Sequence, residues 1–126
     1  MLQFREFEAG PDPFGRKFQV MFQWLQTAIS LRHADSIDVK FLLVDESDAR
    51  TEKTVALPLP GVLRAAAEIG RAVDDAWCAR LAERHLQRLV RSGQDMEKDL
   101  VTVSPDDLGR YAAELARMER RETSAG

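Results

Sequence analysis

The sequence predicts a single α+β domain, in which a small antiparallel β-meander of three or four strands is followed by two or three helices packed on one face. In the first half, apolar residues alternate with a period of two, and in the second half they recur at spacings of three and four. The length of 126 residues suits one domain. We expect that domain to span 1–126, with strands over 1–59, helices over 60–122 and a frayed tail at 123–126.

The composition narrows the class of protein. Hydrophobic residues make up 44% of the chain and charged residues 31%, which is typical of a soluble globular protein and not of a disordered one. The net charge of −3 and the pI of about 5.4 argue against nucleic acid as a partner. A single cysteine excludes an intrachain disulfide framework and a multi-cysteine zinc module. The apolar runs are shorter than the roughly 18 residues of a membrane span, so we expect no membrane partner.

Three features indicate a cytoplasmic, bacterial protein. Arg5 and Glu6 fall where the apolar core of a signal peptide would have to run. Cys78 lies among apolar residues such as Trp77 and Leu81, which predicts a buried thiol in a reducing compartment. The 14 arginines against 4 lysines are typical of the codon bias of a GC-rich bacterial genome.

The first half contains the expected strands. Two prolines and two glycines within residues 9–15 mark a rigid turn. From Phe18 onward residues alternate, and we expect this strand to reach about residue 29 or 31. One side of it carries Phe18, Val20, Phe22 and Trp24, and the other side carries Gln19, Met21, Gln23 and Leu25. A second strand runs from Ile37 to Asp45 and a third over 53–57. The short connections between them favour antiparallel neighbours.

The second half contains the expected helices, and Gly70 leaves two alternatives open. One is a single helix over about 61–91, and the other is a helix that ends at Gly70, followed by a second helix that Asp74 caps. We favour the break. Residues 100–103 can form a short extra strand. Ser104 followed by proline then predicts the start of a last amphipathic helix.

The first candidate site is a cluster of His33, Asp35 and Asp38. His33 and Asp35 are two residues apart, so they share a face where the chain is extended. A histidine with carboxylates can bind a metal or small ligand, or form a base with the group that orients it. The alternative is a charged hairpin loop whose Asp and Ser side chains satisfy turn backbone groups.

The second candidate site is a basic stripe on the helix expected over 75–91. Arginines recur at intervals of four, four and three residues, at Arg80, Arg84, Arg88 and Arg91. Such a stripe can follow phosphates or an acidic partner. The alternative is the solvated face of an amphipathic helix, because arginine is a good helix former.

The motifs of well-known enzyme classes are absent. The sequence holds no glycine-rich nucleotide loop, no G-x-S-x-G, no H-E-x-x-H and no C-x-x-C. We therefore expect no catalytic set, no cofactor and no complete metal site, and a non-enzymatic role is favoured over an enzyme. The two candidate sites remain the alternatives.

Self-association is the favoured role. In the run from Phe41 to Val44 both faces of the strand are apolar, and both faces then need cover. The helices of a domain this long cover about one face. We expect a second copy to cover the other, giving a homodimer through the sheet face. The alternatives are that the N-terminal segment and the helix after Pro60 supply the cover, or that another protein does.

Overall fold

The computed structural model describes residues 6–28 and 35–125, without the side chains of 28 and 121–125. The described residues form a five-stranded sheet and three helices, which confirms the α+β class. The strands are β1 (Glu6–Ala9), β2 (Phe18–Ala28), β3 (Ser36–Asp45), β4 (Arg50–Pro58) and β5 (Leu100–Thr102). The helices are α1 (Leu59–Glu68), α2 (Asp75–Ser92) and α3 (Pro105–Ala125).

The sheet is larger than the expected meander. Within the described chain the strand order is β1-β2-β3-β4-β5, and the first four strands are antiparallel neighbours. Strand β5 is parallel to β4. The difference arises because α1 and α2 lie between these two strands in the sequence, and a long crossover of this kind is what a parallel pair requires.

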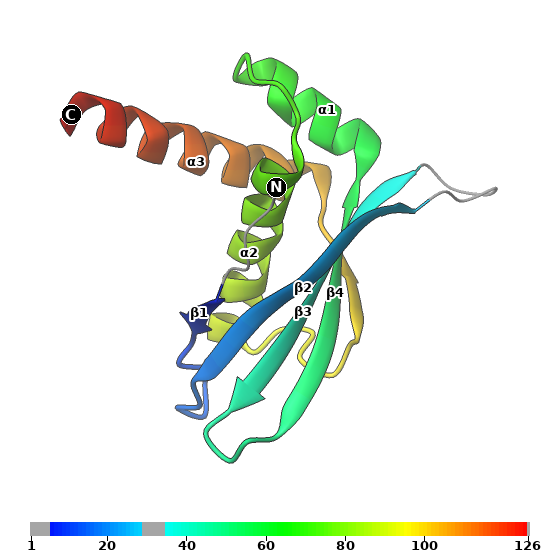
Figure 1. Ribbon diagram of the computed structural model, residues 1–126, viewed down its shortest axis with the longest axis vertical. Coiled ribbons are helices and arrows are strands. Elements are labelled where there is room, and N and C mark those ends of the chain that lie inside the picture. Colours follow the sequence, from blue (N-terminus) through cyan, green and yellow to red (C-terminus); the bar gives the residue numbers. More distant parts are fainter. Residues whose placement is uncertain (1–5, 29–34, 126) are drawn as a thin grey trace.

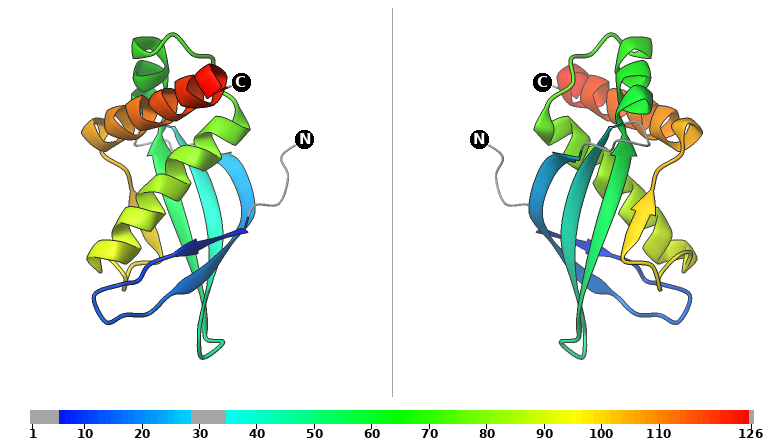
Figure 2. Two further views of the ribbon diagram at one scale, coloured as in Figure 1. Left: turned by 90° about the vertical axis from the view of Figure 1, so that its left-hand side faces the viewer. Right: turned by 90° about the vertical axis from the view of Figure 1, so that its right-hand side faces the viewer.

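The helices are arranged in two ways around the sheet (Figure 1). Helix α2 runs across one face of the sheet (Figure 2, left), while α1 and α3 pack against each other near the end at which β4 leads into α1. The opposite face has no helix of the described chain over it (Figure 2, right). The expectation of helices on one face therefore holds for α2.

A β-bulge corrects the expected faces of β2. Phe18, Val20 and Phe22 are buried on the α2 side, as the alternation predicts. The register then shifts between Phe22 and Trp24, so that Trp24 lies opposite Lys40. The prediction that Trp24 shares their face was wrong, because one extra residue in the bulge reverses the alternation. Trp24 is 37% exposed on the helix-free face, and Leu25 instead lies opposite the buried Val39.

The helix ends confirm the break at Gly70. Its φ of +64° favours glycine. Its N–H donates to the carbonyl of Ala67, and the N–H of Arg71 donates to that of Ala66, which together form a Schellman motif. Asp74 then caps α2 by accepting a hydrogen bond from the N–H of Trp77 at 2.8 Å.

The start of α3 is also as expected. The hydroxyl of Ser104 accepts a hydrogen bond from the N–H of Asp107 at 3.1 Å, and Pro105 is the first helical residue. Gly61 lets α1 pack closely on α3, because a Cβ there would lie 2.8 Å from a methyl carbon of Leu108. These local signals fix where each helix begins, and packing fixes how the helices meet.

A buried lysine joins the sheet to the loop between α2 and β5. Lys53 of β4 is 1% exposed, on the same side of the sheet as α2. Its ammonium donates to the backbone carbonyls of Asp95, at 2.8 Å, and of Lys98. Burial lowers the pKa of Lys53, and the nearby carboxylates of Asp95 and Asp99 oppose that change. The charged Lys53 side chain therefore holds the loop between α2 and β5 against the sheet.

We predict that Lys53→Met destabilises the fold by about 1–3 kcal/mol, because the two carbonyls lose a charged hydrogen-bond donor while remaining shielded from water. Urea unfolding measures this change. The matched control is Lys17→Met, whose side chain is 53% exposed and 3.7 Å from Glu8. Its effect should stay within about 0.5 kcal/mol. Equal stability of the two variants would contradict the role given to Lys53.

Candidate functional site

The structure describes only part of the His33 cluster, because His33 lies outside the described residues. The backbone carbonyl of Asp35 accepts a hydrogen bond from the N–H of Leu59 at 2.8 Å. The carboxylate of Asp38 accepts one from the hydroxyl of Ser36, also at 2.8 Å. Among the described residues, no three His, Cys, Asp or Glu side chains are grouped to hold a metal ion. The candidate site of His33, Asp35 and Asp38 therefore stays a prediction.

The arginine stripe of α2 lies along α3. Three of its four members form ion pairs with acidic residues of that helix, and we call this set the α2–α3 ladder. Its N···O distances are 3.6 Å for Arg80–Glu119, 2.7 Å for Arg84–Glu114 and 2.7 Å for Arg88–Asp107. From Arg80 to Arg88 the residue numbers increase, whereas those of their partners decrease from Glu119 to Asp107. The two helices therefore run in opposite directions where they meet. Three of the four arginines are therefore partly exposed and paired with acidic residues.

A buried polar network continues the ladder inward. His85 is 6% exposed and Tyr111 is 3% exposed. Nδ1 of His85 lies 2.9 Å from the hydroxyl of Tyr111, which also accepts a hydrogen bond from Arg88 at 3.3 Å. Since that hydroxyl accepts from Arg88, it is placed to donate its own proton to a neutral imidazole.

Burial lowers the pKa of His85, an effect that the charge of Arg88 reinforces and that of Asp107 opposes. Burial also raises the pKa of Tyr111. Both groups are therefore held neutral near pH 7. Neutral groups that share a hydrogen bond in the interior fix the relative position of α2 and α3, because a misplaced helix would leave them unpaired.

A hollow of about 460 Å³ opens over the outer side of this network, between the second half of α2 and the first turns of α3. We call it the arginine hollow. It is lined by Arg84, Gln87, Arg88, Arg91, Ser92, Arg110, Tyr111 and Glu114. Arg91 makes no ion pair with any residue that the structure describes, and Arg110 is 55% exposed at 3.4 Å from Asp107. Positive charge therefore exceeds negative charge in this hollow.

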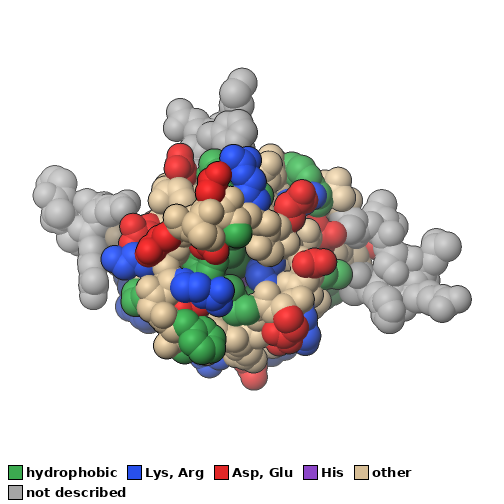
Figure 3. All heavy atoms as spheres, turned by 90° about the horizontal axis from the view of Figure 1, so that it is seen from below, with side chains coloured by type: hydrophobic (Ala, Val, Ile, Leu, Met, Phe, Trp, Pro, Cys, Tyr) green, Lys and Arg blue, Asp and Glu red, His purple; other side chains and the backbone are tan. Residues whose placement is uncertain are grey.

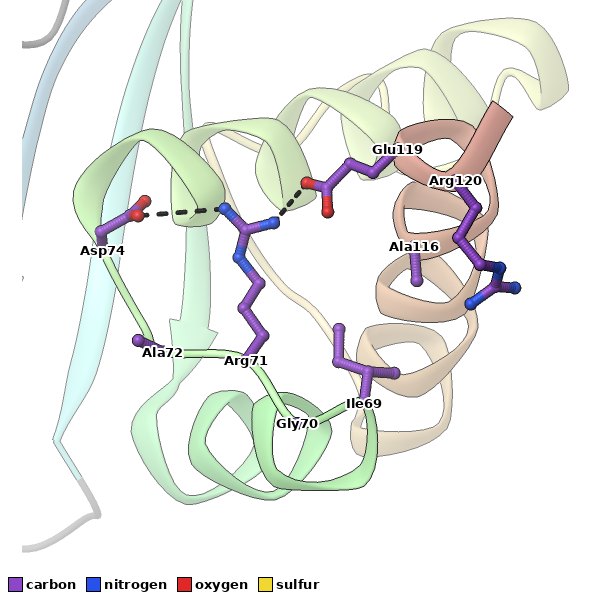
Figure 4. Close-up of a pocket in the computed structure, with 8 residues that line it drawn as sticks. All are labelled: Ile69, Gly70, Arg71, Ala72, Asp74, Ala116, Glu119 and Arg120. Atoms are coloured by element: carbon purple, nitrogen blue, oxygen red, sulfur yellow. Dashed lines mark hydrogen bonds and ion pairs between the residues drawn. The ribbon is translucent and has the colours of Figure 1, made fainter. Parts of the chain in front are cut away.

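A larger hollow of about 710 Å³ lies between residues 69–74 and the far end of α3 (Figure 4). Arg71 occupies its centre, where it pairs with Glu119 and lies 3.9 Å from Asp74. The guanidinium also lies 5.5 Å from the centre of the Trp77 ring. Arg120 points away from this pair (Figure 4). Because Asp74 and Glu119 both lie beside Arg71, this arrangement joins the turn to α3.

Two other parts of the molecule are weaker candidates for a functional site. Burial raises the pKa of the Cys78 thiol to about 12, so this side chain is a poor nucleophile at pH 7. At the end of the molecule that carries the β3–β4 turn, acidic and basic side chains are intermingled with hydrophobic ones (Figure 3). The arginine hollow is therefore the best-defined place for an anion to bind.

Sequence reasoning identified one side of the α2–α3 ladder and missed the other. The stripe of α2 follows from its spacing, whereas no residue of α3 was predicted to belong to a site. A signal was present, because Asp107, Tyr111 and Glu114 are separated by four and three residues and so share one helix face. That spacing does not say which helix the face will meet.

We predict that the free energy of unfolding falls as the pH drops below about 6.5, and that His85→Gln removes most of this fall. The unfolded chain takes up a proton near pH 6.5, whereas burial lowers the pKa of His85 in the folded state. The stabilisation is thus complete above pH 6.5 and is lost toward the lower, folded pKa. For one proton the slope cannot exceed about 1.4 kcal/mol per pH unit.

The measurement is urea unfolding between about pH 7.5 and pH 5, above the range in which most carboxylates titrate. The other histidine of the chain supplies the control, since His33→Gln should keep the dependence. A flat profile for the unmodified protein, or the same profile in His85→Gln, would contradict the buried neutral histidine.

Among the helices that the structure describes, none has the length and apolar character needed to cross a bilayer. Comparison with models of known protein families, with curated proteins and with solved structures finds no match for this chain.

Proposed function

We propose that this chain is a non-enzymatic module that associates with a second copy of itself through the helix-free face of its sheet. We call the outward side chains of this face the open sheet face. Its apolar members are Met21, Trp24, Leu42, Val44 and Leu100, and its charged members are Glu6, Glu8, Asp38, Lys40, Arg50 and Glu52. The observation that carries the proposal is that Met21, Trp24 and Leu42 lie on neighbouring strands of a face over which no described helix lies.

The apolar residues form neighbouring rows across the strands. Met21 pairs with Leu42, and Trp24 lies in the same row as Lys40 and Thr54, which leads to Leu100 at the sheet edge. Trp24 is 37% exposed and Leu100 is 56% exposed. Exposed apolar side chains on an uncovered sheet face are typical of an interface rather than of a solvated sheet.

The charges of the open sheet face suit a second copy better than a strongly charged partner. Two cations and four anions are present among its described residues, so the face carries charges of both signs. Lys40 pairs with Glu52 and lies 5.7 Å from the centre of the Trp24 ring. In a twofold interface each patch meets itself, so a face that carries charges of both signs can be self-complementary.

The shape of the open sheet face also favours binding of a second copy. A hollow of about 340 Å³ lies between Trp24, Leu42 and Arg50. A protruding side chain of a second copy can fill such a hollow and form the central contact of an interface. We place this association in a reducing compartment, the cytoplasm, because the cysteine is a free, buried thiol.

We predict that Leu100→Glu weakens the dimer by about tenfold or more, because it introduces a charge that must lose water when the face is covered. Sedimentation velocity over a range of protein concentrations measures the dissociation constant. Leu63→Glu is the matched control, since Leu63 is 52% exposed on α1, away from this face. It should leave the dissociation constant unchanged.

Leu42→Glu, at the centre of the face, should have a larger effect than Leu100→Glu, and circular dichroism verifies that both variants fold. A chain that stays monomeric at every concentration up to about 200 μM, far above the dissociation constants of stable dimers, would overturn the proposal. So would equal weakening by Leu63→Glu. A complex of the open sheet face with a different protein, formed while the chain alone is monomeric, would also overturn self-association.

A further inference from the structure

The arginine hollow has a charge that the fold itself does not balance. Arg84 is held by Glu114, to which its Nε and Nη2 atoms both lie at 2.7 Å. Asp107 lies 2.7 Å from Arg88 and 3.4 Å from Arg110, so it is shared between two cations. Arg91 adds a further guanidinium. With these described residues counted, four guanidinium groups face two carboxylates, and two positive charges are in excess.

The hollow is also ordered before any ligand arrives. Tyr111, at its floor, is 3% exposed and accepts a hydrogen bond from Nη1 of Arg88, the atom that also donates to Asp107. This holds the Arg88 guanidinium in one orientation. A cation that is fixed in advance loses less conformational entropy when it binds an anion. Arg91 and Arg110, in contrast, are exposed at the rim, where they can close on a ligand.

We propose that the arginine hollow binds a small phosphate monoester, with Arg91 and Arg110 as its principal contacts and Arg88 at its base. A phosphate monoester carries about −1.5 to −2 charges at pH 7, which matches the excess of two positive charges, whereas one carboxylate would balance only half. Guanidinium groups bind the oxygens of a phosphate in pairs. The volume of about 460 Å³ lies within the range of small-ligand pockets and leaves room for the organic part of the ester.

A nucleic acid fits the same surface less well. A nucleic-acid backbone needs a continuous positive track, and here Glu114 and Asp107 interrupt it and pair with the arginines on either side. The remaining two positive charges lie at one end of α2, beside the first turns of α3. Because the hollow lies on the helical side of the molecule, this site is independent of the open sheet face.

Isothermal titration calorimetry of the full chain, at low salt so that screening is weak, tests the proposal with glycerol phosphate as the probe. The double variant Arg91→Ala and Arg110→Ala should lower the affinity by about tenfold or more while keeping the thermal midpoint, since both side chains are exposed. Arg64→Ala is the matched control, because Arg64 is 80% exposed on α1 and should not affect binding.

Further titrations identify the source of the anion. Inorganic phosphate should bind more weakly than glycerol phosphate, because it lacks the organic part. Sulfate that binds as tightly as glycerol phosphate would show an unspecific anion site and overturn the proposal. No heat at about millimolar glycerol phosphate would also overturn it. Two further overturning results are unchanged affinity in the double variant and tighter binding of a single-stranded oligonucleotide than of either phosphate probe.

Discussion

The contact between α2 and the sheet sets the position of every other part of the molecule. Trp77, Leu81 and Leu86 of α2 are fully buried, and so are Val39 and Phe41 of the facing β3. Fully burying an aliphatic or aromatic side chain contributes about 1.5–3 kcal/mol, so a few such residues determine how the helix lies. Since no other described helix lies across the sheet, this one contact also determines which face is left uncovered.

Polar groups at the margin of α2 then determine where α3 goes. The ladder pairs are partly exposed, and each such pair contributes little to stability. The ion pairs and the buried His85–Tyr111 hydrogen bond instead select one position of α3 along α2. Sliding α3 by one turn would separate Arg84 from Glu114 and leave His85 without the hydroxyl of Tyr111. A buried hydrogen bond that has a single good partner penalises other registers more than it stabilises the native one.

Local rules were sufficient for most of the fold. The break at Gly70 and the caps at Asp74 and Ser104 follow from short-range chemistry that is visible in a few residues. The bulge beside Trp24 has no such signal, because a β-bulge depends on how two strands twist together. The parallel pairing of β5 was likewise beyond sequence reasoning, since three residues can pair with either edge of a sheet until the packing of α2 decides.

The candidate sites were predictable to a smaller extent for the same reason. Spacing placed Arg80, Arg84 and Arg88 on one face of α2, but it could not show that acidic residues of α3 would neutralise that face. The informative grouping, in which Arg91 and Arg110 share a hollow, joins residues of two helices and appears only after folding.

The two proposed surfaces lie on opposite sides of the sheet, and this has a consequence for how they would work together. A twofold dimer that buries the open sheet face would place α2 and α3 of each copy on the outside. Both arginine hollows would then stay accessible, because nothing in the interface approaches them. Binding in the hollow could alter the dimer only by moving α2, whose Trp77 and Leu81 are packed against the sheet. Since packed cores resist small displacements, we expect the two surfaces to act independently, as ligand site and assembly site of one rigid domain.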